Sequence, residues 1–441
     1  MKYYLIILLT LLVAGCTKSV DPVFPETPDE RLQKTLTAYR SKLIQAPGWK
    51  LFVYPSGLAS QDIEVGGLAY YLRFPDSNRV SMVSDFRLET AQSPKESGYR
   101  IRADQRPQLV FDTYSYIHLA ADPDPDVSNS PTQQPGFGWG TDFEFEFTKS
   151  EPGDTLFLEG VFNKSQAIML PATQEEIDAA FGGRLAHIVE STKNFSASTP
   201  FLFFTGSDNS QIEVSFNLFL SRINFNYISD NSAITTSVPF SHTTYGVHFK
   251  NPVTVGGYTF QDMFWDDAQN RYYIETSGGR VNISGTTTPI IAFHLVLGRA
   301  ITSITVPQEP LPGQSNDFIA IRNQINNDLI NGPYGLALLD MIFTFDANSS
   351  SMTLYVLVEQ SGVVFVLQYQ YNYTINSSNI ANFTRTGQNG NAGLVQNEMA
   401  PLINRIDNDN FKLDYFTGVA PPLGQFTSQN TPGFEFTGNL E

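Results

Sequence analysis

The sequence predicts a mainly β protein with a few helices, built from antiparallel β lobes of barrel or sandwich type, each preceded by an amphipathic helix. Two observations support this class. The 441 residues include 34 Phe and 20 Tyr, and short apolar runs are separated by Gly, Asn, Ser and Pro. With 41 % hydrophobic and 16 % charged residues, the composition is that of a globular protein. The formal charge of −17 excludes a nucleic-acid-binding protein, because such binding requires clustered Lys and Arg.

Residues 1–15 have the features of a lipoprotein signal peptide. Lys2 precedes an apolar run of about ten residues, half of the ~20 that a permanent membrane helix requires, and Ala14-Gly15 fits a cleavage site. Cys16 is the only cysteine, so it cannot form an internal disulfide. Val-Ala-Gly-Cys resembles a bacterial lipoprotein box, which implies lipidation of Cys16 and a tether over residues 16–26. The alternative is an ordinary secreted protein with one free cysteine.

The first lobe is predicted over residues 27–305. Thr27 and Glu30 form a capping box, and the helix that follows ends at Pro47-Gly48. After a strand at 49–54, a meander of short strands is expected. In TDFEFEF at 141–147, the alternation places Phe on one face and carboxylates on the other. The candidate strands are 67–74, 79–88, 99–103, 108–119, 141–148 and 155–162.

A second helix is predicted after Thr173, where a second capping-box sequence occurs, although Gly182-Gly183 weakens it. Strands are expected to resume beyond it, with a hairpin turn at Gly256-Gly257. Their ranges are 201–205, 211–228, 245–254 and 258–265.

The clearest change in composition is the linker 306–315, which holds three Pro and one Gly. It separates the first lobe from a C-terminal lobe at 316–441. This lobe is expected to start with an amphipathic helix and to contain strands at 336–345, 352–358 and 363–374 and a helix at 394–406. Because the three main helices start at similar intervals, near residues 29, 174 and 316, a partition into three units is the alternative to two.

The sequence contains no Walker loop, HExxH, Gly-x-Ser-x-Gly or CxxC motif. No catalytic residue, metal site or cofactor is therefore predicted. Asp142 and Glu144 are the best carboxylates for an alternative glycoside hydrolase, because alternate residues of a strand lie about 7 Å apart and such enzymes use two acids about 5–9.5 Å apart. Any exposed face of an acidic β protein offers the same arrangement.

Trp139 and Trp265 are the candidate ligand-binding residues. They lie in GFGWG at 136–140 and beside Asp-Asp at 266–267. Flat aromatic faces beside polar loops suit glycan binding, which combines stacking with hydroxyl hydrogen bonds. The alternatives are a core position for either Trp and, for Trp139, a turn before the 141–147 strand.

Several motifs are distinctive as a set: PDERL at 28–32, PGW at 47–49, FDTY at 111–114, GWGTDFEF at 138–145 and YGV at 245–247. Together with the lipoprotein box, they resemble a group of Bacteroidetes lipoproteins catalogued as domain of unknown function 4302. The resemblance extends to about residue 300 and implies no site residues. Such lipoproteins are often encoded beside starch-utilisation-type outer-membrane transporters, which implies an accessory role in nutrient capture.

We therefore expect a non-catalytic outer-membrane lipoprotein that binds a glycan or peptide and serves a transporter complex. The lipid on Cys16 would hold it to the membrane. TKSVD at 17–21 departs from the acidic run that marks surface export in related proteins, so the cell surface and the periplasmic face both stay open. The alternative functions are a glycoside hydrolase using Asp142 or Glu144, and a structural partner of an outer-membrane complex.

Overall fold

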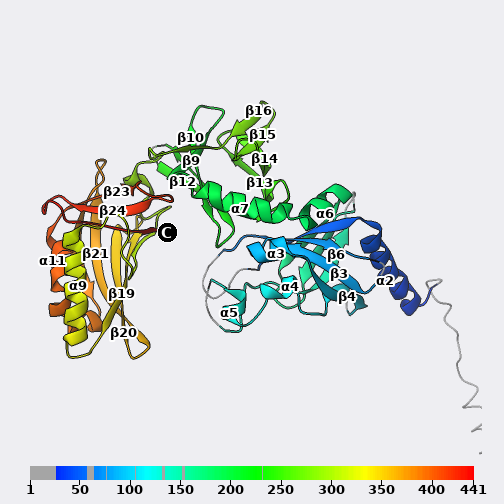
Figure 1. Ribbon diagram of the computed structural model, residues 1–441, viewed down its shortest axis with the longest axis horizontal. Helices are drawn as coiled ribbons and strands as arrows, with labels where there is room; N and C mark the ends of the chain where they lie inside the picture. Colours follow the sequence, from blue (N-terminus) through cyan, green and yellow to red (C-terminus); the bar gives the residue numbers. More distant parts are fainter. Residues whose placement is uncertain are drawn as a thin grey trace, which may run out of the picture.

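A computed structural model describes residues 26–56, 64–75, 77–104, 106–131, 135–150, 154–230 and 232–441. The chain forms three β units in sequence order: a closed eight-stranded barrel, a nine-stranded sheet and a second closed eight-stranded barrel (Figure 1). Nearly all strands pair in antiparallel order with their sequence neighbours. The predicted class of antiparallel β lobes with a few helices is confirmed. Cys16 and the predicted signal peptide at 1–15 lie outside the described residues.

The first barrel follows helix α2 (Pro28–Gln45), whose capping box is confirmed: Glu30 N donates to Thr27 Oγ1 and Thr27 N donates to Glu30 Oε2. Strand β8 closes the barrel by pairing with β1. Short helices α3 (Leu88–Gln92), α4 (Tyr116–Leu119) and α5 (Pro125–Ser128) lie in its loops. The strands are β1 (Gly48–Tyr54), β2 (Leu68–Arg73), β3 (Arg79–Ser84), β4 (Lys95–Ala103), β5 (Pro107–Phe111), β6 (Glu144–Ser150), β7 (Leu156–Gly160) and β8 (Gln166–Ala172).

Side chains fill the first barrel. Phe145 and Phe147 point into its core, as the alternation predicted, whereas Phe143 precedes β6 and is exposed. The predicted strand at 108–119 is wrong in its second half. Strand β5 ends at Phe111, and Ser115, whose N–H donates to His118 Nδ1, begins helix α4.

The middle unit follows helices α6 (Gln174–Phe181) and α7 (Arg184–Ser196), which replace the single helix predicted after Thr173. Gly183, with φ +92°, breaks the helix because only glycine adopts that conformation readily. The predicted strand at 211–228 is a hairpin of two strands. The unit contains β9 (Phe201–Thr205), β10 (Gln211–Asn217), β11 (Arg222–Ser229), β12 (Ser232–His242), β13 (Gly246–Val255), β14 (Tyr258–Asp266), β15 (Arg271–Thr276), β16 (Gly279–Asn282) and β17 (Ser284–Thr286).

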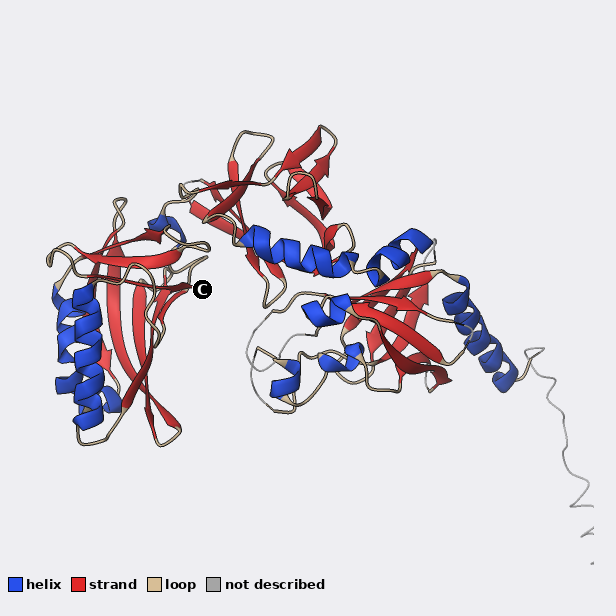
Figure 2. Cartoon of the chain, viewed as in Figure 1, coloured by secondary structure: helices blue, strands red, loops and turns tan. Residues whose placement is uncertain are grey.

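The third unit is a barrel against which two long helices pack side by side (Figure 2). Its first strand, β18 (Ser303–Val306), pairs with β19 and β25, so it precedes most of the predicted 306–315 linker and helix α9 (Asn316–Asn331). Phe318 of α9 stacks on Phe436 with ring centroids 4.6 Å apart. The remaining elements are α8 (Phe293–Val296), β19 (Ala337–Asp346), β20 (Ser351–Gln360), β21 (Val363–Ile375), β22 (Ile380–Gln388), α10 (Gly390–Leu394), α11 (Gln396–Asn408), β23 (Phe411–Phe416), β24 (Leu423–Ser428) and β25 (Glu435–Leu440).

Candidate functional site

Buried hydrogen bonds join the first barrel to the middle sheet. Asp85, just after β3, accepts from Ala69 N within the barrel and from His242 N of β12, both at 2.7 Å. Tyr71 Oη accepts from Thr244 N at 3.0 Å. Each bond satisfies a backbone donor that would otherwise be buried without a partner. The two units therefore meet in one defined geometry.

A glycine pair permits the closest approach at this junction. Gly66 N donates to Leu220 O at 2.6 Å, and Gly67 N donates to Phe240 O at 3.1 Å. A Cβ on Gly66 would lie 1.9 Å from Ser221 O, so no larger residue fits there. Sequence analysis did not single out Gly66-Gly67; a glycine pair at the start of a strand was the available signal.

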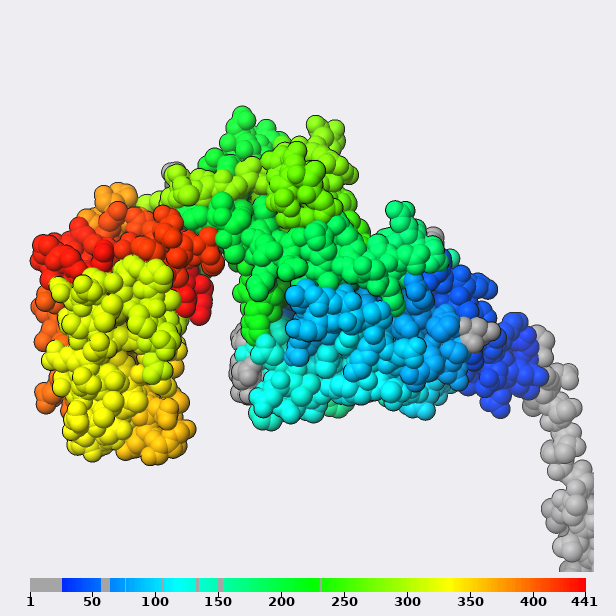
Figure 3. All heavy atoms as spheres, in the orientation of Figure 1, coloured from blue at the N-terminus to red at the C-terminus, as the bar shows by residue number. Residues whose placement is uncertain are grey.

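A cavity of about 350 Å³ lies at this junction, where the middle unit rests on the first barrel (Figure 3). Its walls come from three parts of the chain: loops of the barrel, one face of α7, and the β10–β11 turn with the end of β12. The volume lies near the small end of the range for ligand pockets, about 300–1,000 Å³. Residues that line it include Asp85, Phe86, Arg87, Trp139, Glu190, Lys193, Phe219 and His242.

Three aromatic rings form the apolar part of the cavity. Phe86 and Phe219 each make edge-to-face contact with Trp139, at centroid distances of 6.0 and 5.7 Å. Trp139 is 7 % exposed and donates from Nε1 to Ser128 O, which fixes its ring. Phe219 is 49 % exposed and stands at the rim. Trp139, a predicted site residue, therefore lines a cavity rather than standing free on the surface.

Charged and amide groups surround these rings. Glu190 and Asn194 are four residues apart on α7, as are Val189 and Lys193, so these two pairs face the cavity together. The Arg87 guanidinium lies 4.9 Å above the centroid of the Phe86 ring. This mixture of donors, acceptors and aromatic surface suits a small ligand that carries hydroxyl or amide groups.

Trp265, the other predicted site residue, lies in the core of the middle sheet. It is 8 % exposed, and its ring contacts Phe195 and Tyr272 at centroid distances of 5.8 and 5.2 Å. It lines neither this cavity nor a smaller one between β12 and β13. The two predicted tryptophans are thus not brought together.

Asp142 and Glu144, the carboxylates of the hydrolase alternative, have structural partners. Asp142 is 4 % exposed and accepts from three backbone N–H groups and from the hydroxyl of Ser165. Glu144 forms an ion pair with Arg102 at 2.7 Å. These contacts anchor Asp142 to the loop at 162–165 and join Glu144 to Arg102 of β4.

A Ser, a His and an Asp meet on the surface of the middle unit without forming a catalytic triad. His187 Nε2 lies 2.9 Å from Asp267 Oδ1 and 3.5 Å from Ser191 Oγ. A triad requires the two partners on different ring nitrogens, whereas both contact Nε2 here. Arg184 hydrogen-bonds to Asp267 and holds the pKa of that carboxyl below its usual value.

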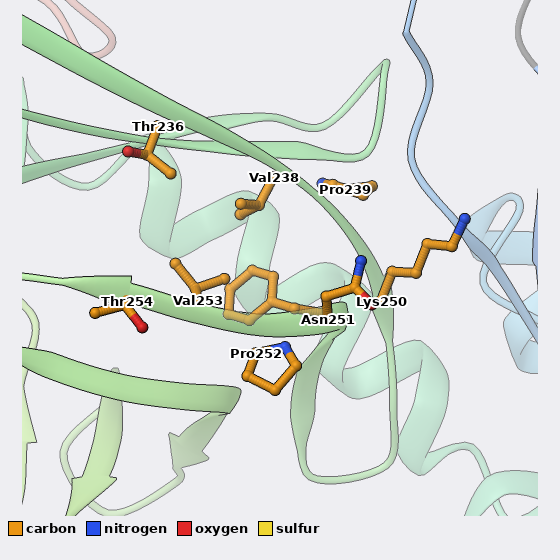
Figure 4. Close-up of a pocket in the computed structure, with 9 residues that line it drawn as sticks. Thr236, Val238, Pro239, Lys250, Asn251, Pro252, Val253 and Thr254 are labelled. Atoms are coloured by element: carbon orange, nitrogen blue, oxygen red, sulfur yellow. The ribbon is translucent and has the colours of Figure 1, made fainter.

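A smaller cavity of about 190 Å³ lies where β12 and β13 diverge. These strands pair only from Phe240 to His242 and from Val247 to Phe249. Figure 4 shows Val238 and Val253 pointing into the gap, while Lys250 extends away from it. Its volume is well below the about 300 Å³ of the smallest usual ligand pockets.

The described part of the chain contains no group of three or more His, Cys, Asp or Glu side chains placed to hold a metal ion. Of the helices in that part, none is both long and apolar enough to cross a membrane.

The family model for domain of unknown function DUF4302 matches residues 20–267, more than half of the chain. The chain belongs to this family. The matched range contains every residue that lines the larger cavity. No curated protein matches the chain. Among solved structures, the Helicobacter pylori beta clamp in complex with 3,4-difluorobenzamide is aligned over 93 % of this chain and 98 % of its own, at 9 % identity and a TM-score of 0.14. A similarity this low carries no information on fold or function.

Proposed function

We propose that this DUF4302 protein is an outer-membrane lipoprotein, lipidated at Cys16, that binds a glycan or peptide nutrient for a transporter complex. In this proposal the protein is a non-catalytic binding partner. The binding site is the cavity between the first barrel and the middle sheet.

The composition of that cavity is the main support for a binding function. Trp139, Phe86 and Phe219 supply apolar ring surface, and charged and amide side chains of α7 surround them. Pockets that bind small molecules combine predominantly apolar walls with a few placed polar groups. Two units must meet to form the cavity, and the residues that line it from both units lie within the family-matched range.

A thermal-shift screen of residues 17–441 against glycans and peptides tests this proposal. A ligand at ~100 times its dissociation constant stabilises the folded state by about 2.7 kcal/mol, which raises the melting temperature measurably. Phe219→Ala removes an exposed wall residue without opening a core, so it should abolish the shift and leave the unliganded melting temperature nearly unchanged.

Phe162→Ala is the matched control, because Phe162 is 88 % exposed and lies away from the cavity. It should keep the full shift. A ligand whose shift is equal in the wild type and Phe219→Ala binds elsewhere and contradicts the assignment of the site. Absence of any shift across both ligand classes contradicts the binding function.

A further inference from the structure

The third barrel ends in a hairpin that exposes apolar side chains on both faces. Strands β20 and β21 meet in this hairpin, at the end of the barrel away from the middle unit (Figure 1). Contiguous apolar side chains on a surface usually mark an interaction site. Four consecutive residues of β21 are 38–55 % exposed: Val363, Val364, Phe365 and Val366.

Among the described residues, no strand lies beside one edge of this part of β21, although helix α10 contacts β21 farther along the chain. β20 pairs with β21 from Val363 onward, but β22 joins on the other side only at Tyr369. The turn residues Ser361 and Gly362 both have positive φ, which is typical of a two-residue type I′ turn flanked by a hydrogen-bonded pair. The strand alternation then directs the backbone N–H and C=O groups of Val364 and Val366 toward the open edge.

Hydrogen bonds show that the backbone C=O of Val366 points toward the open edge. Val366 O accepts from Asn389 Nδ2 at 3.0 Å and from Asn391 Nδ2 at 3.2 Å. Within the described ranges, no partner contacts Val366 N or either backbone group of Val364. An edge with free backbone groups and apolar, uncharged side chains is a template for an added strand.

We propose that this edge binds an extended segment of a partner protein as an added β-strand. The N–H and C=O of Val364 and the N–H of Val366 would pair with the segment, and its side chains would pack beside the apolar side chains on both faces of the hairpin. A ligand lying across one face would leave the other face exposed. Strand addition therefore accounts for the free backbone groups and for both apolar faces.

Charge indicates the chemistry of the partner segment. Residues 303–441 contain four Lys and Arg against twelve Asp and Glu, a formal charge of −8, and residues 361–369 contain none of these four. A second copy of this chain, or an anionic membrane, would meet like charge. The structure thus favours an apolar segment flanked by Lys or Arg. This site is separate from the ligand cavity and does not depend on the proposed function.

The test is fluorescence anisotropy of a labelled peptide, KVTVTVK, titrated with residues 17–441. The wild type should give a saturable rise, and a peptide with Pro at its central position should give none. Val364→Pro removes one outward N–H and no ladder bond, so it should weaken binding at least tenfold. Ala233→Pro of β12 is the matched control and should bind like the wild type. Phe240 N donates to Ser221 O across the β11–β12 ladder, so the N–H groups of odd-numbered β12 residues such as Ala233 point away from that ladder.

If Val364→Pro does not fold, Val364→Lys replaces it, because lysine at an edge opposes strand addition and repels the basic peptide. No saturable rise with the wild type, or equal affinity in both Val364 variants and the wild type, overturns the proposal. Dimerisation of the wild type that Val364→Lys abolishes would assign the edge to a second copy instead. Flotation with phosphatidylcholine vesicles that Val364→Pro retains and Val364→Lys abolishes would assign the hairpin to a lipid surface instead.

Discussion

Asp85 should be the largest single polar contribution to the contact between the first barrel and the middle sheet. Its carboxylate accepts from Ala69 N and His242 N, and both residues are at least nine-tenths buried. Asp85→Ala leaves both N–H groups without an acceptor. At about 1–3 kcal/mol for each unsatisfied buried donor, the free energy of unfolding should fall by about 2–6 kcal/mol.

Guanidinium denaturation, with tryptophan fluorescence as the signal, measures this loss. Asp85→Asn keeps one carbonyl oxygen and should lose about half as much. Asp328→Ala, an exposed helical position on α9, is the control and should change stability by less than about 0.5 kcal/mol. A loss below about 1 kcal/mol for Asp85→Ala would refute the reasoning, because the two donors would then have other partners.

Three further substitutions test other parts of the fold by thermal unfolding. Burial raises the pKa of Glu213, whose Oε2 has no hydrogen-bond partner among the described residues, so stability is greatest where Glu213 is protonated and falls as the pH rises. Glu213→Gln should therefore be more stable than the wild type at pH 7, by about 1–3 kcal/mol, and no more stable below pH ~4. Gly66→Ala should destabilise by about 1–3 kcal/mol, because its Cβ would overlap Ser221 O. Phe436→Ala should cost about 3–5 kcal/mol, since the ring is buried between Phe318 and Phe426.

A different result would contradict each of these three predictions. A gain for Glu213→Gln that persists at low pH would mean that its charge is not the cause. Wild-type stability of Gly66→Ala would mean that the junction tolerates a side chain there. A loss for Phe436→Ala below about 1 kcal/mol would mean that the third barrel repacks around the gap. Phe162→Ala, at an 88 % exposed ring, provides the common baseline.

Helix starts and strand faces were predicted correctly where a few neighbouring residues determine them. The capping boxes at Thr27 and Thr173 mark real helix starts, and the alternation at 144–147 directs Phe145 and Phe147 into the barrel. The strand predicted at 108–119 is too long. Its apolar residues continue past the Asp112–Ser115 break, but those beyond the break belong to a short helix. The β10–β11 turn at 218–221 contains no Gly or Pro and therefore gives no turn signal.

The cavity could not be predicted from sequence, because its walls come from separate segments spread between Leu68 and His242. Trp139 was found as an aromatic residue in a glycine-rich segment, but its neighbours Phe86 and Phe219 carry no motif. Trp265 has an equally polar sequence context and is a core residue. Composition near a tryptophan therefore does not distinguish a cavity wall from a core position.

A tryptophan emission titration, with a ligand from the thermal-shift screen, is the most direct test of the proposed binding site. The chain has three tryptophans, and of these only Trp139 lines the larger cavity. The wild type should show a saturable change in emission, and Trp139→Phe, which keeps an aromatic ring, should retain the thermal shift but lose that change. An emission change that persists in Trp139→Phe would place the ligand near Trp49 or Trp265 and would contradict the account.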